Sequence, residues 1–272
     1  MERRISLLKE AVQAVHEELH QASDYYEAWR PTVHDAEVSK RMGTSYATNT
    51  YEVIRQALRR EMVLALMRVW DTNKQAVRLS LVGSELKDRE VVEALAAEYG
   101  SLFLQGQPKL GRMSANDTLE ERAALAEAVR AHREREAADF VQRSTREPIR
   151  EALQIIARYQ AGGSGLDILS HLTQVRHTRL AHRQLVSPAP LPIANIAERT
   201  DEMFQDMLRL THLLRLGVQG IHYEPDATAK IQAGYARLFW RGVRGERTEG
   251  HPDYQPPRVR RTPEQAPPEA LE

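Results

Sequence analysis

The segment NTYEVIRQALRREMVLALMRVW, residues 49 to 70, indicates the fold class of this protein. Its first half is polar, whereas from Met62 to Trp70 apolar residues fall on most faces of the helix that the spacing predicts. A helix that is apolar on most faces lies in a core and must be surrounded by other elements. The segment therefore predicts a central helix.

Two long segments are suitable partners for this central helix. Residues 2–28 place apolar side chains three and four residues apart, which predicts a long first helix with one apolar stripe. Residues 195–218 place apolar side chains near heptad spacing, which favours lengthwise packing against another helix. With no strand-like alternation in the chain, these segments predict an all-α helical bundle.

Further helices are expected between these segments. Short helical patterns cover 79–86 and 88–99, and residues 101–117 contain several turn formers and are expected to be irregular. Thr118 and Glu121 match a capping box at the start of a highly charged helix. Its apolar stripe thins between His132 and Glu136, so this part is expected to project into solvent or to join another chain. Pro148 is expected to begin a separate helix, because its fixed φ suits a first turn.

Composition limits the classes of protein to consider. Lys and Arg together number 38, as do Asp and Glu, so any basic site must be local. The chain has no cysteine, which excludes disulfides and thiolate chemistry and fits a reducing cytoplasm. No segment has the length and apolarity of a signal peptide core or a membrane span. We expect a cytoplasmic protein that does not contact a membrane.

The chain is expected to divide into three parts. Residues 1–225 form the helical domain, and residues 226–244 form a short C-terminal helix. Residues 245–272 are rich in proline and nearly free of apolar side chains, which predicts a disordered tail.

One motif near the N-terminus suggests a metal site. His16, Glu17 and His20 match the H-E-x-x-H pattern of zinc hydrolases. The same helical spacing places Leu19 on the apolar stripe and the two histidines at its edge, as on an ordinary solvated helix flank. No third histidine follows at the spacing of a zinc protease. We therefore expect no metal and no cofactor, with a zinc hydrolase as a minor alternative.

The decapeptide VRHTRLAHRQ, residues 175–184, concentrates cationic and titratable side chains. If the preceding helix continued, Arg179 would share its buried face and Arg176 would lie at the edge, at a cost of several kcal/mol without partners. Either the helix ends near Val175 or this face opens into a cleft. A continued helix would align Arg176, Arg179 and Arg183 one turn apart, as suits phosphate binding. A basic helix end that satisfies its own carbonyl groups is the structural alternative.

Arginines beside a titratable histidine also suit RNA cleavage without a metal. His182 can move a proton at the 2′-hydroxyl or the departing 5′-oxygen, while arginine stabilises charge on the phosphorane. Two proton transfers are needed, so the second group is His177 or the His182 of a symmetry-related chain.

At these residues the sequence resembles the HEPN superfamily, and in particular the HEPN domain of abortive-infection AbiU-type proteins. The resemblance rests on Arg176, five intervening residues and His182, on a polar residue directly after the arginine, and on the helix YEVIRQALRREMVLALMRVWD. It implies a HEPN-like helical bundle with extra helices, and a metal-independent endoribonuclease acting in phage defence or as a toxin. By this resemblance Arg176 and His182 are the catalytic pair and His177 supports them.

The resemblance also implies partners: RNA, a second copy of the chain whose motif lines the same cleft, and an antitoxin or sensor protein. Arg179 and Arg183 are expected to bind RNA phosphates on the basis of helix geometry alone. HEPN proteins also include noncatalytic members. The alternative is therefore a helical module of a defence complex that binds RNA or protein through the decapeptide and the charged helix at 121–136.

Overall fold

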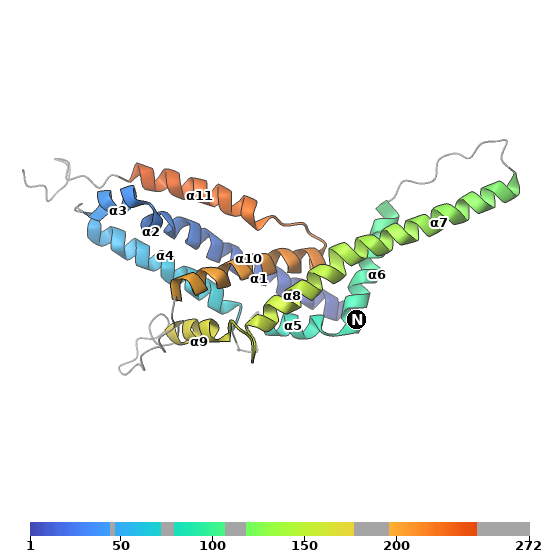
Figure 1. The fold of residues 1–272 in the computed structure, drawn as a ribbon, viewed down its shortest axis with the longest axis horizontal. Coiled ribbons are helices and arrows are strands. Elements are labelled where there is room, and N and C mark those ends of the chain that lie inside the picture. The colour runs from blue at the N-terminus through green and yellow to red at the C-terminus, as the bar shows by residue number, and fades with distance from the viewer. Residues whose placement is uncertain (44–46, 72–78, 107–117, 177–195, 244–272) are drawn as a thin grey trace, which may run out of the picture.

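The computed structural model describes residues 1–43, 47–71, 79–106, 118–176 and 196–243, which form an all-α bundle with no strand in these ranges (Figure 1). The helices are α1 (Glu2–Trp29), α2 (Pro31–His34), α3 (Ala36–Gly43), α4 (Thr48–Arg68), α5 (Leu79–Leu86), α6 (Arg89–Gly106), α7 (Leu119–Val141), α8 (Glu147–Arg158), α9 (Leu166–Val175), α10 (Ile196–Gln219) and α11 (Pro225–Gly242). The all-α prediction is confirmed. The tail at 245–272 lies outside the described residues.

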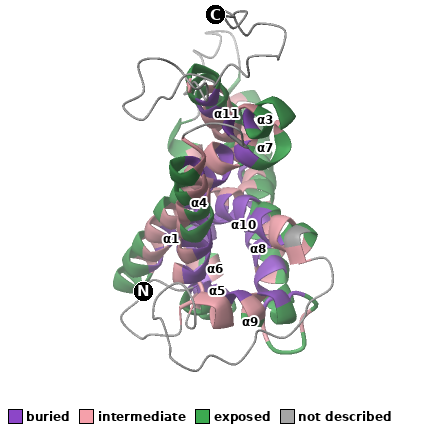
Figure 2. Cartoon of the chain, turned by 90° about the vertical axis from the view of Figure 1, so that its left-hand side faces the viewer, coloured by how far each residue is buried: buried purple, intermediate pink, exposed green. Residues whose placement is uncertain are grey.

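The core forms where α1, α4, α8 and α10 pack together. The apolar stripe of α1 is buried there, and Leu66 of α4 and Met203 and Met207 of α10 are inaccessible to solvent. Figure 2 shows that buried residues gather on the inner sides of the helices. The central role predicted for residues 62–70 and the lengthwise packing predicted for 195–218 are both confirmed.

The α11 helix packs along α1 and closes a second, smaller core cluster. Trp240 of α11 is buried beside Tyr51 of α4, and its indole N–H donates to the Ala28 carbonyl at 2.8 Å. Tyr51 in turn donates to the Thr32 carbonyl at 2.8 Å. These contacts join α11 to α1 and α4, and α4 to α2.

The α7 helix extends away from the other helices in Figure 1. The predicted capping box begins it: Thr118 accepts from the Glu121 N–H, and the Glu121 carboxylate accepts from the Thr118 N–H. Only Ala137 and Val141, near its C-terminal end, are buried. The projection expected from the thin apolar stripe is therefore present.

One predicted helix boundary is confirmed and another is wrong. Pro148 lies in the first turn of α8, as predicted, and a π-helical turn, Gln142–Arg146, joins α8 directly to α7. Residues 101–106 are not irregular but complete α6, where Phe103 stacks on Phe140 of α7 with ring centroids 4.7 Å apart. There, packing of α6 against α7 extends the helix beyond its local signals.

Candidate functional site

Arg176 follows the last residue of α9 and begins the sequence that suggested RNA chemistry. Ile168 and Leu172 bury one face of α9 in the core, which fixes the direction in which the helix ends. The Arg176 backbone N–H donates to the carbonyls of Leu172 and Thr173. Its side chain is 22% exposed. The described part of α9 ends at Val175, and residues 177–184, on which the two alternatives for the decapeptide depend, lie outside the described residues.

Asp71 supplies the partner that a mostly buried arginine needs. The Arg176 Nη2 group donates to the Asp71 carboxylate at 2.8 Å, and Asp71 is itself only 23% exposed. A second guanidinium nitrogen, Nη1, lies 3.5 Å from the Met67 carbonyl. The pair therefore joins the end of α9 to the end of α4 and offsets the cost of burying the cation.

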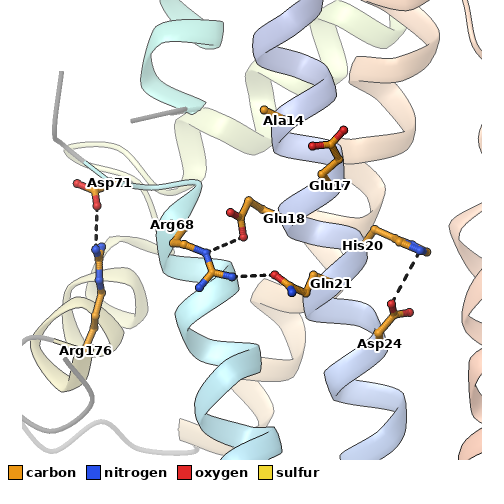
Figure 3. Close-up of a pocket in the computed structure, with 9 residues that line it drawn as sticks. All are labelled: Ala14, Glu17, Glu18, His20, Gln21, Asp24, Arg68, Asp71 and Arg176. Atoms are coloured by element: carbon orange, nitrogen blue, oxygen red, sulfur yellow. Dashed lines mark hydrogen bonds and ion pairs between the residues drawn. The ribbon is translucent and has the colours of Figure 1, made fainter. Parts of the chain in front are cut away.

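A cavity of about 790 Å³ lies beside this ion pair (Figure 3). A space of this size is in the usual range for a small-molecule or nucleotide site. Its lining comes from α1, from the end of α4 and from the end of α9: Ala14, Glu17, Glu18, His20, Gln21, Asp24, Arg68, Asp71 and Arg176. Most of these side chains carry charge, so the cavity suits a polar or ionic ligand.

Arg68, the last residue of α4, lies in this cavity. Its Nε group donates to the Glu18 carboxylate at 2.7 Å, and its Nη2 group donates to the Gln21 amide oxygen at 2.9 Å. No sequence pattern distinguishes Arg68, because a charged residue at a helix end ordinarily faces solvent. It is recognised only in the structure, where it contacts Glu18 and Gln21, which lie one turn apart on α1.

His20 lies at the other side of the cavity. In Figure 3 its ring points away from Arg68 and Arg176 and toward Asp24, whose carboxylate is 3.9 Å from Nε2. Burial raises the pKa of Asp24, and the neighbouring His20 opposes that rise. The two groups thus form a weak, partly exposed pair rather than part of the Arg176 cluster.

The interpretation of the H-E-x-x-H motif as a solvated flank is wrong for His16. Its ring packs edge-on against Tyr223, with centroids 4.7 Å apart. Burial, the nearby Arg215 and His20 together lower the pKa of His16 to about 4. Among the described residues, no three His, Asp or Glu side chains converge as metal ligands. The two histidines of the motif therefore have different surroundings.

The other predicted site residues lie outside the described residues. These are His177, Arg179, His182 and Arg183. The structure thus brings one predicted catalytic residue, Arg176, to the cavity, together with Arg68 and Asp71, which the sequence did not single out. The catalytic and phosphate-binding roles of the predicted site residues remain predictions.

Comparison with known proteins identifies the family. A model of HEPN domains, described as AbiU2, matches residues 5–239. No curated protein and no solved structure matches the chain. Across the helices that the structure describes, none combines the length and hydropathy needed to span a membrane. Since the match covers most of the chain and the described fold is an all-α bundle, this protein belongs to the AbiU2 family of HEPN domains.

Proposed function

We propose that this protein is a metal-independent RNA endonuclease of phage defence, in which Arg176 and His182 form the catalytic pair. Membership of the AbiU2 family suggests a function related to abortive infection, and HEPN domains are often ribonucleases. The nuclease activity, the toxicity that it implies and the dimer cleft are parts of the proposal.

The placement of Arg176 is the observation that carries the proposal. Its guanidinium lines the 790 Å³ cavity and is oriented by Asp71 rather than free in solvent. An arginine that is held in place can stabilise charge on a phosphorane without reorganising first. Its planar fork of N–H groups matches the oxygens of a phosphate.

The proposed reaction needs two proton transfers and no added reactant. One group removes the proton of the ribose 2′-hydroxyl, and the oxygen attacks the adjacent phosphorus. The bond from phosphorus to the 5′-oxygen breaks, and a second group protonates that oxygen. The products are a 2′,3′-cyclic phosphate and a 5′-hydroxyl. His182 supplies one transfer, and His177 or the His182 of a second copy supplies the other.

Cleavage of total RNA by the purified full chain in excess EDTA tests this function. Wild type is expected to cleave, whereas His182→Ala and Arg176→Ala are expected to lose activity and keep the helical content of wild type. His222→Ala is the matched control, because His222 is exposed and pairs with Glu224 outside the cavity lining. Equal cleavage by wild type and His182→Ala would refute the proposed catalytic pair.

The second candidate is a noncatalytic module that binds RNA or a protein. The projecting α7 favours it, because the exposed charged residues of this helix offer a long surface. A wild-type chain that binds RNA or a defence protein without cleaving RNA would support this candidate. Sedimentation equilibrium tests the proposed twofold dimer independently of activity.

A further inference from the structure

We infer that Arg68 is a second phosphate-binding arginine, which holds the RNA backbone in the same cavity as Arg176. The inference rests on the proposed function, since it names a further residue that would contact the RNA substrate. It concerns an arginine on α4, far in sequence from the decapeptide that suggested RNA chemistry.

The end of α4 contributes to the cavity in two ways. The Met67 carbonyl lies 3.5 Å from Nη1 of Arg176, so the backbone of this turn contacts the first arginine. The next residue, Arg68, directs its own side chain to the cavity lining. In Figure 3 Arg68 lies between the Asp71–Arg176 pair and the side chains of α1. Two guanidinium groups from separate helices thus share one space.

Arg68 is held in place, but only some of its N–H groups donate to a described residue. A guanidinium carries five N–H groups, and Arg68 uses one on Glu18 and one on Gln21. The remaining three make no hydrogen bond to any of the residues that the structure describes, and the side chain is 37% exposed. The group therefore keeps donors for an external acceptor, while two side chains of α1 fix its plane.

An anionic acceptor fits these donors best. One of the two groups that hold Arg68 is the neutral amide of Gln21, so Glu18 is the one described carboxylate that is hydrogen-bonded to it. Of the other carboxylates in the lining, Asp71 is paired with Arg176, and Glu17 and Asp24 make no hydrogen bond to Arg68. A phosphate can accept two parallel, charge-assisted N–H bonds from a guanidinium, which are among the stronger hydrogen bonds in proteins. The competing explanation is that Arg68 only ties α4 to α1.

Salt dependence of RNA binding separates the two explanations. Each phosphate contact on a single strand contributes about 0.7 to the slope of log K against log salt concentration. The probe is a 2′-O-methylated single-stranded oligonucleotide, which has no 2′-hydroxyl to attack, with the full-length chain. We expect Arg68→Gln to weaken binding roughly five- to tenfold and to reduce the slope by about 0.7.

Two variants serve as matched controls. Arg55→Gln removes an arginine of the same helix with nearly the same exposure, 38%, whose ion pair with Glu52 lies outside the cavity lining. Glu18→Gln removes the carboxylate that pairs with Arg68 but keeps the arginine. Arg55→Gln is expected to retain the wild-type slope, and Glu18→Gln, which keeps the charge of Arg68, is expected to lose less affinity than Arg68→Gln. Arg68→Met keeps an unbranched stem without charge and replaces Arg68→Gln in the test if thermal unfolding shows the latter to be unfolded.

The inference is overturned if the folded Arg68 variant, Arg68→Gln or Arg68→Met, binds the probe with the wild-type salt slope. It is also overturned if Glu18→Gln loses as much affinity as Arg68→Gln. Failure of wild type to bind the probe also overturns it. The cleavage assay in EDTA decides the proposed function separately. If wild type cleaves RNA but Arg68→Gln binds the probe with the wild-type slope, the proposed function stands and only the role of Arg68 is refuted.

Discussion

Arg176 and Asp71 form an ion pair of 2.8 Å between two segments that are 105 residues apart in the sequence. Both side chains are mostly buried. In such a place an arginine without a partner costs free energy, and one with a partner takes a fixed direction. Asp71 is therefore a positioning residue for the arginine that the proposed reaction needs.

Asp71→Asn is expected to lower RNA cleavage by about tenfold, because a guanidinium that is no longer held must reorganise before it can stabilise the phosphorane. Asparagine keeps the size of aspartate and one oxygen acceptor but loses the charge that holds the guanidinium. The cleavage rate in EDTA and the thermal midpoint are measured together. Glu151→Gln, which breaks the exposed Arg209–Glu151 pair at 2.9 Å, is the control. Cleavage at the wild-type rate by Asp71→Asn would remove the positioning role.

The core was predictable because the apolar residues of a buried helix face recur at helical spacing in the sequence. Leu66 lies in the apolar half of its helix, and the near-heptad spacing of 195–218 placed Met203 and Met207 on one face; all three are buried. The charged residues that line the cavity show no such periodic pattern. Arg68, Glu18 and Asp71 are ordinary charged residues of a chain rich in charge, and only the packing of α1, α4 and α9 brings them together.

The start of α8 at Pro148 was predictable from the sequence, whereas the π-helical turn that joins it to α7 was not. Proline lacks an N–H and usually marks the first turn of a helix. Here the π-helical turn just before it already interrupts the regular hydrogen-bond pattern, so the proline fits into a continuous helical segment. The turn packs against α10 and α6, and those contacts are not visible in the local sequence.

Stability is expected to fall as pH drops from about 6.5 to about 4, with His16 as one cause. The folded pKa of His16 lies below its unfolded value, so the unfolded chain takes up the proton first. The contribution is complete above the unfolded pKa and is lost as pH approaches the folded one. His16→Phe keeps a ring against Tyr223 without titrating. Across this pH range, the fall in the free energy of unfolding in urea should be about 1 to 2 kcal/mol smaller in the variant than in wild type. This figure allows for the partial exposure of His16. Parallel curves for the two proteins would contradict this.

Thr118→Ala is expected to loosen the first turn of α7 by about 1 kcal/mol, because it removes the acceptor of the Glu121 N–H. The start of α7 is exposed, so the effect should be local. Hydrogen exchange of the amides of 119–122 is therefore the measurement, rather than the global melting temperature. Thr118→Ser keeps the hydroxyl acceptor and should exchange as slowly as wild type. Equal protection in the alanine variant would show that the cap contributes nothing.

Gly220→Ala is expected to destabilise the protein by about 2 kcal/mol or more, because two costs add. Gly220 has a φ of 66°, which disfavours any residue with a Cβ, and an added Cβ would lie 2.7 Å from Cε1 of Tyr99. Tyr99 cannot move away freely, since its hydroxyl donates to the Val218 carbonyl at 2.7 Å. Gly234→Ala is the matched control: it lies in α11, an added Cβ meets nothing within 4 Å, and alanine should stabilise that helix by about 0.5 to 1 kcal/mol. Urea unfolding of both variants checks the prediction, and a Gly220→Ala protein as stable as wild type would show that the turn after α10 can rearrange around the new side chain.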